Sequence, residues 1–202
     1  SEKMHLPVMM RMVTRLAHSR AAITPFAENK WICQNDLSKG DRSQWMLLPA
    51  LARKNYEKMI EKQKDLIDYS EKTKWNSLAI NPRRDDLAIV TSGLGHNYYL
   101  ENLNDYTDLC NARYNGRGVP SVLHIGTLPL PKDLLEKLAN ATKAILVLEE
   151  GMPFVEKALK GVLPQNITVM GKLSGHLPRT GELNPDIVRK ALGLPLKDSM
   201  YS

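Results

Sequence analysis

The segment that decides the fold is Ala144-Ile145-Leu146-Val147-Leu148-Glu149-Glu150-Gly151, five apolar residues followed by two acids and a glycine. A short apolar run bounded by a turn signal is typical of a strand that is buried on both faces of a sheet. Similar runs occupy residues 87–91, 119–125 and 167–171. Helical patterns lie between these runs, at about 95–109, at 132–142 and after Pro153, which is expected in the first turn of its helix. This alternation predicts βαβ units.

The last helix carries its own end signals. Asn184 is expected as the N-cap, Pro185 lies in the first turn, and Gly193 follows the end. Residues 76–196 are therefore predicted to form an α/β domain, a three-layer αβα arrangement around an open, mainly parallel sheet.

Two segments with other patterns precede this domain. Residues 50–72 predict a long amphipathic helix packed on a domain surface, within a linker of residues 25–75. Residues 6–15 predict a buried strand that runs into the polar turn His18-Ser19-Arg20. One strand cannot bury both faces alone, so residues 1–24 are interpreted as the end of a truncated domain, and residues 197–202 as a tail.

The composition excludes several classes of protein. Hydrophobic residues make up 43% of the chain and charged residues 25%, as in ordinary globular proteins, and no apolar run is long enough to cross a membrane. The N-terminus does not resemble a signal peptide, so we expect a cytoplasmic protein. Cys33 and Cys110 form no CxxC pair, which argues against a metal site. The net charge of +6 is spread along the chain with only 6% aromatic residues, which argues against nucleic-acid binding.

Ligands of open α/β sheets bind beyond the carboxyl ends of the strands. Ser92, Gly93 and Gly95 form a turn there whose backbone amides are weak candidates for binding a phosphate. Tyr98 occupies the place of the third glycine in GxGxxG, and a tight turn that requires glycine is the alternative explanation.

Other polar residues suggest structural roles or anion binding. Glu149 and Glu150 should point to opposite sides of their strand, so a pairing with a helix N-terminus or an arginine is favoured over acid–base catalysis. His96, His124 and His176 are isolated in sequence, and His124 is interpreted as a core residue. Three cationic residues are candidates for binding a substrate or anion, with an unspecialised surface cluster as the alternative: Arg15, His18 and Arg20. No catalytic residue is assigned.

Several motifs in order carry a resemblance. They are Leu6-Pro7-Val8 with Arg11, Thr14-Arg15, His18-Ser19-Arg20, Leu48-Pro49-Ala50, Thr91-Ser92-Gly93, Leu128-Pro129-Leu130-Pro131, Leu148-Glu149-Glu150, Gly171-Lys172, Leu177-Pro178-Arg179 and Gly181-Glu182-Leu183-Asn184-Pro185. Together they resemble the alpha subunits of indolepyruvate ferredoxin oxidoreductases, within the 2-oxoacid:ferredoxin oxidoreductase group.

The resemblance implies a role in the oxidative decarboxylation of aryl 2-oxoacids to acyl-CoA. It implies thiamine diphosphate, magnesium and iron–sulfur clusters in the parent enzyme, with coenzyme A, ferredoxin, a beta subunit and the other domains of the subunit as partners. Residues 1–24 would end a pyrimidine-binding domain, and residues 76–196 would be a transketolase-C-terminal-like domain. The chain has no GDG…N motif and no cysteine cluster, so we expect it to bind no cofactor and to be inactive alone. A free-standing α/β binding or assembly module is the alternative.

Overall fold

The computed structural model describes residues 6–10, 12–24, 46 and 48–197. The chain divides into two compact units, residues 1–57 and 58–202. This division falls within the long helix, whereas the predicted boundaries at residues 24 and 75 remain predictions. Nearly all the regular structure belongs to the second unit.

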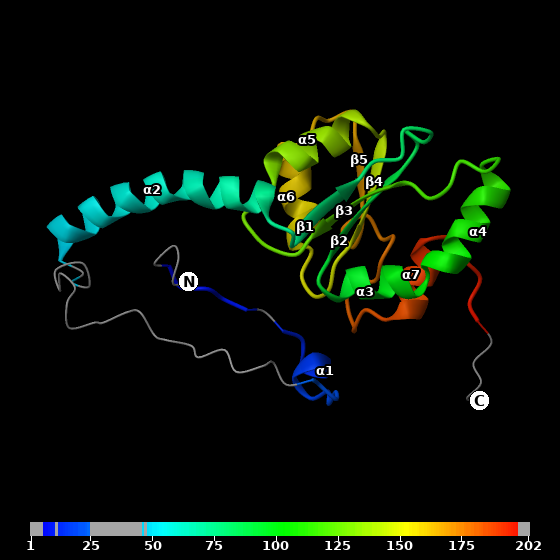
Figure 1. Cartoon of the computed structure of the whole chain (residues 1–202), viewed down its shortest axis with the longest axis horizontal. Coiled ribbons are helices and arrows are strands. Elements are labelled where there is room, and N and C mark those ends of the chain that lie inside the picture. Colours follow the sequence, from blue (N-terminus) through cyan, green and yellow to red (C-terminus); the bar gives the residue numbers. More distant parts are fainter. Residues whose placement is uncertain (1–5, 11, 25–45, 47, 198–202) are drawn as a thin grey trace. The chain divides into compact units, whose positions relative to one another are not determined.

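The second unit is built on a five-stranded sheet with the order β1-β3-β2-β4-β5 (Figure 1). Strands β2, β3, β4 and β5 run parallel to one another, and β1 pairs antiparallel with β3 at one edge of the sheet. The strands are β1 Asn76–Ala79, β2 Ala88–Ser92, β3 Ser121–Ile125, β4 Ala144–Leu148 and β5 Thr168–Met170. The predicted α/β class with an open, mainly parallel sheet is confirmed.

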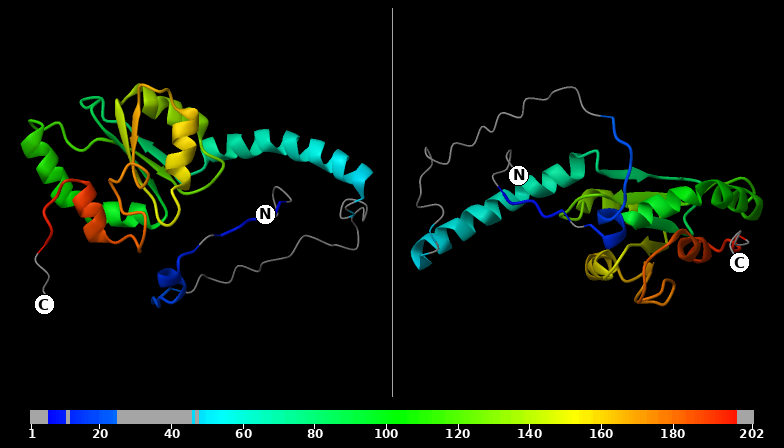
Figure 2. Two further views of the ribbon diagram at one scale, coloured as in Figure 1. Left: turned by 180° about the vertical axis from the view of Figure 1, so that it is seen from behind. Right: turned by 90° about the horizontal axis from the view of Figure 1, so that it is seen from below.

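Helices cover both faces of the sheet (Figure 1, with further views in Figure 2). One face packs against α5 Lys132–Asn140 and α6 Phe154–Val162, which share a core cluster with the strands. The other face packs against α3 Leu94–Glu101, α4 Leu103–Arg113 and α7 Pro185–Ala191. The three-layer arrangement follows from this distribution.

The apolar run at β4 shows why this sheet needs two helical layers. Ile145 and Val147 belong to the cluster on the α5 and α6 side, whereas Leu146 and Leu148 belong to the cluster on the α3 and α7 side. Successive side chains of a strand point to opposite faces, so a continuous apolar run must be covered twice. All four residues are at most 3% exposed.

The structure departs from three expectations within this unit. The helix expected at 95–109 is interrupted at Asn102, whose side chain donates to the carbonyls of Tyr98 and Pro185 and thereby ties the break to α7. Strand β1 was not predicted, because four residues are too few to show an alternating pattern. Pro153 is the N-cap of α6, one position before the expected first turn.

The predicted N-terminal strand is wrong for residues 6–10 and 12–13, which form no strand. A short helix, α1 Thr14–Ala17, follows them instead. A strand requires a neighbour that supplies hydrogen bonds, and no described residue pairs with this segment.

The long helix is confirmed as α2 Pro49–Lys72. Its C-terminal end is fixed to the sheet domain, because Ser70 is fully buried and donates to the carbonyl of Pro129. In the middle of α2, the face that was expected to be packed is largely exposed, with Met59 43% and Ile60 45% exposed. Packing of this helix is therefore established only near its C-terminal end. No helix in the described part of the chain is long and apolar enough to span a membrane.

Candidate functional site

Three strands place a row of polar side chains near the carboxyl end of the parallel sheet. In register, Thr91 of β2 lies beside His124 of β3, and His124 lies beside Ser77 of β1. Side chains of residues paired in this way point to the same face of the sheet. Leu148 of β4 completes the row on the other side of Thr91 and belongs to the core cluster under α3 and α7.

Helix α3 adds a second histidine to this row. The His96 ring stacks on the His124 ring, with centroids 3.8 Å apart and an interplanar angle of 25°. The Oγ1 atom of Thr91 lies 3.1 Å from Nδ1 of His96 and 3.2 Å from Nδ1 of His124. Thr91 is fully buried, so its hydroxyl is a fixed anchor for both rings.

The turn before α3 explains how His96 reaches this position. Gly93 adopts φ 55° and ψ −134°, a backbone conformation that glycine adopts readily. A Cβ atom on Gly95 would lie only 2.3 Å from the carbonyl oxygen of Leu148, so the helix can approach β4 only without a side chain there. The backbone conformation thus accounts for glycine at position 93, and packing against β4 accounts for glycine at position 95. The phosphate role suggested for Ser92, Gly93 and Gly95 remains a prediction.

The two imidazoles favour the neutral form. Burial lowers the pKa of His96 below its usual 6.5. The pKa of His124 is lowered by burial and further by the neighbouring His96, while a hydrogen bond to the Thr91 backbone opposes the change. At neutral pH the uncharged form of both rings is therefore favoured.

One shared hydroxyl restricts the tautomers of the two rings. A threonine hydroxyl has a single proton to donate, so it can donate to the Nδ1 of only one ring. The other ring must donate its own Nδ1 proton to the hydroxyl oxygen. When the hydroxyl donates to one ring, that ring carries its proton on Nε2 and the other presents an Nε2 lone pair. In this arrangement the pair offers one donor and one acceptor.

Sequence reasoning missed this pair because the two histidines lie on different elements, α3 and β3, with α4 between them in the chain. His124 is half-buried and stacked on His96, so its interpretation as a residue of the apolar core holds only in part. To predict the pair, one would have needed the register of β2 and β3, which brings Thr91 beside His124. His176 lies elsewhere, exposed and 3.0 Å from the hydroxyl of Ser174.

The acidic pair after β4 is structural, as predicted. Glu149 accepts hydrogen bonds from the amides of Val155 and Glu156 at the start of α6, at 2.8 and 2.9 Å. Burial raises the pKa of Glu149, and those backbone hydrogen bonds oppose the rise. Glu150 accepts from the amide of Leu183 at 3.2 Å. Both carboxylates hold backbone segments in place.

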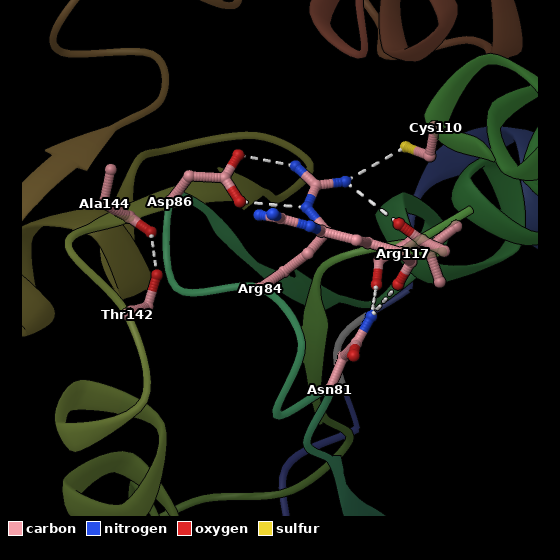
Figure 3. Close-up of polar contacts among 9 residues, drawn as sticks. Asn81, Arg84, Asp86, Cys110, Arg117, Thr142 and Ala144 are labelled. Carbon is pink, nitrogen blue, oxygen red and sulfur yellow. Dashed lines mark hydrogen bonds and ion pairs between the residues drawn. The ribbon is translucent and has the colours of Figure 1, made fainter. Parts of the chain in front are cut away.

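A second polar cluster lies before the amino end of β2 (Figure 3). Arg84 is 3% exposed, forms two hydrogen bonds with Asp86 and donates to the sulfur of Cys110 at 3.3 Å. Its guanidinium also lies over the ring of Tyr114, 3.7 Å from the centroid. A buried guanidinium with this many partners is satisfied, so the cluster fastens α4 to the sheet.

Arg15, His18 and Arg20 lie in the first unit, on and just after α1, and all three are exposed. Their suggested role in binding a substrate or anion remains a prediction. Cys33 falls outside the described residues.

The residues of this chain do not supply the ligands of an iron–sulfur cluster, one of the cofactors that the resemblance implies. An iron–sulfur cluster takes four cysteine thiolates or a similar set, whereas the chain has two cysteines and Cys110 is buried against Arg84. Within the described residues, no group of three histidine, cysteine, aspartate or glutamate side chains is arranged to hold a metal ion.

Comparison with known proteins identifies relatives over nearly the whole chain. No protein-family model matches it. It is 31% identical to the indolepyruvate oxidoreductase subunit IorA of Methanothermobacter thermautotrophicus over 95% of its length. The resemblance to indolepyruvate oxidoreductase subunits is confirmed. The IorA proteins of Methanothermobacter marburgensis and Archaeoglobus fulgidus are each 30% identical, over 95% and 98% of this chain.

The chain spans only 30% of the length of each of these IorA relatives. Among solved structures, a 2-oxoglutarate:ferredoxin oxidoreductase from Magnetococcus marinus, with 2-oxoglutarate, coenzyme A and succinyl-CoA bound, aligns with 62% of this chain and 21% of its own. That alignment has a TM-score of 0.45 and 12% sequence identity. The IorA match covers both units of the chain, whereas the histidine pair is a feature of the second unit alone.

Proposed function

We propose that this chain forms part of an oxidoreductase subunit that acts on indolepyruvate or another aryl 2-oxoacid. The reaction would be oxidative decarboxylation to an acyl-CoA, with thiamine diphosphate as the cofactor and ferredoxin as the electron acceptor. The observation that carries the proposal is the 31% identity to an indolepyruvate oxidoreductase subunit over 95% of the chain. Nearly complete coverage at this identity reflects shared ancestry of the whole piece.

Within such an enzyme, the role proposed for this piece is structural, at the contacts between domains and subunits. Its polar groups at the carboxyl edge support that role, because they are used to position backbone. Glu149 holds the start of α6, Glu150 holds the loop at Leu183, and the buried Lys172 donates to the carbonyl of Gly151 at 2.8 Å. The loops after β4 and β5 are thereby tied into one surface.

The proposal is tested with the native complex. An affinity tag placed on this chain at its genomic locus should co-purify an activity that reduces ferredoxin or methyl viologen in the presence of indolepyruvate and coenzyme A. Phenylpyruvate should serve as a second substrate, and 2-oxoglutarate is the discriminating control. A purified complex that contains this chain but oxidises no aryl 2-oxoacid would contradict the proposal and favour a binding or assembly module.

The isolated chain tests the structural role separately. Calorimetry should detect no binding of thiamine diphosphate with magnesium, and metal determination should find no iron, because the chain lacks the GDG…N motif and a cysteine cluster. Tight binding of either cofactor by these 202 residues would refute the proposal that this chain has only a structural role.

A further inference from the structure

The histidine pair lies at the uncovered part of a sheet face. Tyr98, Tyr99, Leu177 and Val188 pack in the core cluster on this face, beside β2 and β4. Toward the edge strand the covering ends, because Ser77 and Ala79 of β1 are exposed and His124 is half-buried. The two rings therefore stand at a border between the packed core and the open sheet.

Neither Nε2 atom of the pair is a buried, unpartnered atom in the described part of the chain. The contacts of His96 and His124 are the ring stack, the two Nδ1 contacts with the Thr91 hydroxyl and, for His124, a hydrogen bond with the Thr91 backbone. The one buried side-chain nitrogen or oxygen without a partner among the described residues is the hydroxyl of Tyr99, so neither Nε2 is sealed inside the protein. The edges that carry the donor and the acceptor are thus accessible.

Among the described residues, no carboxylate, lysine or arginine side chain contributes to the pKa shift of either ring. The neighbours in the sheet are Ser77 on β1 and Thr91 on β2, both uncharged. The effects on the pKa of His96 are those of burial, and those on the pKa of His124 come from burial, His96 and the Thr91 backbone. A proton that enters this site would have no carboxylate of the described chain to stabilise it, so a negative charge must come from outside.

We propose that His96 and His124 form a binding site for a small monocarboxylate that takes up one proton when it is filled. The ring that presents an Nε2 lone pair accepts the proton, and both Nε2–H groups then donate to the carboxylate oxygens. The Thr91 contacts need no rearrangement, because the protonated ring keeps its Nδ1 proton on the hydroxyl oxygen. Hydrogen bonds between ionised partners are the strong class, so the ligand stabilises the charge that binding creates.

The charge balance selects the ligand class. A second proton would place two positive rings 3.8 Å apart, which like-charge repulsion disfavours. The site therefore gains one positive charge and neutralises one negative charge. A monocarboxylate satisfies this balance, whereas the dianion of phosphate would leave an uncompensated charge at a half-buried position. This binding uses only residues of this chain and is independent of the proposed oxidoreductase activity.

The test uses the full chain with acetate as the probe. Acetate should shift the histidine ring resonances of His96 and His124 in NMR spectra and leave those of His176 unchanged. Calorimetry in two buffers of different ionisation enthalpy should show uptake of up to one proton per acetate. Because the occupied site carries the extra proton, the apparent affinity should fall about tenfold per pH unit above neutrality. Unchanged resonances at tens of millimolar acetate, or binding without proton uptake, would overturn the proposal.

Variants test whether acetate binds at the histidine pair or elsewhere on the surface. His124→Gln and His96→Gln should each weaken acetate binding at least about tenfold, since each removes one donor or the proton acceptor. His176→Gln, at an exposed histidine outside the site, is the matched control and should bind acetate as the unmodified chain does. Inorganic phosphate that binds as tightly as acetate would contradict the monocarboxylate class.

Discussion

Thr91 contacts two imidazoles through one hydroxyl, and the burial of these two rings gives the protein a pH-dependent feature. Both histidines have a folded-state pKa below the ordinary 6.5, so their neutral forms are favoured in the folded chain. In the pH range between the folded-state and unfolded-state pKa values, the unfolded chain therefore binds more protons than the folded chain. Their contribution to stability is present above a pH of about 6.5 and is lost as the pH falls through the folded-state pKa.

We expect the free energy of unfolding to decrease between a pH of about 7.5 and a pH of about 6, with part of this decrease due to the pair. Urea unfolding at a series of pH values measures the slope. The slope should be smaller for His124→Gln than for the unmodified chain, and unchanged for His176→Gln. Equal slopes in all three proteins would show that the pair does not titrate differently in the folded and unfolded states.

Glycine at position 95 is required by packing, which a matched pair of substitutions can test. Gly95→Ala brings a Cβ atom to 2.3 Å from the backbone oxygen of Leu148 and should cost about 1–3 kcal/mol of stability. Gly161→Ala meets no atom within 4 Å on α6 and should stabilise the chain by about 0.4–1 kcal/mol. Thermal unfolding distinguishes the two. Similar effects from both substitutions would contradict the packing explanation. In sequence these two glycines look alike, because only the neighbouring strand tells them apart.

At the scale of elements, two helices are capped by carboxylates from other parts of the chain. The N-cap residues of α5 and α6 are Pro131 and Pro153, which have no side-chain oxygen to satisfy the first amides. Glu71 of α2 accepts from the amides of Asp133 and Leu134 in α5, and Glu149 accepts from two amides of α6. Each carboxylate thus caps a helix and joins it to another element.

Removing these caps should lower stability to different extents. Glu71→Ala should cost about 0.5–2 kcal/mol, as loss of an N-cap does. Glu149→Ala should cost more, because Glu149 is only 4% exposed and its loss leaves buried amides unsatisfied, each at about 1–3 kcal/mol. Glu61→Ala, at an exposed position of α2, is the control and should change stability by less than about 0.5 kcal/mol. Chemical denaturation gives all three values, and an equal cost for Glu61 and Glu71 would exclude the capping role.

The elements that sequence predicted best are those whose signals are local. The four parallel strands and the cap of α7, where Asn184 accepts from the amide of Ile187, follow from apolar runs and end signals. The missed elements depend on distant partners. β1 exists through its pairing with β3, the break at Asn102 through contacts with α7, and the histidine pair through strand register. The N-terminal strand was predicted from an apolar run that has no described pairing partner.

At the scale of the whole molecule, the two units differ in how well they bury apolar side chains. The second unit encloses two clusters around its sheet, whereas the described part of residues 6–24 leaves Val8 71%, Met9 93% and Ile23 83% exposed. Contiguous exposed apolar residues favour contact with another protein surface. In the proposed oxidoreductase, such a surface belongs to the rest of the subunit or to a partner.

This difference predicts how the isolated chain behaves in solution. The full chain should associate increasingly as its concentration rises, because burying these side chains between copies removes apolar surface from water. A version without residues 1–24 should sediment as a monomer over the same range. A full-length variant with Val8→Ser and Met9→Ser keeps the length and should also lose association, which separates the effect of apolar side chains from that of chain length. Sedimentation velocity at several concentrations measures all three, and identical behaviour would assign the exposed segment no role in association.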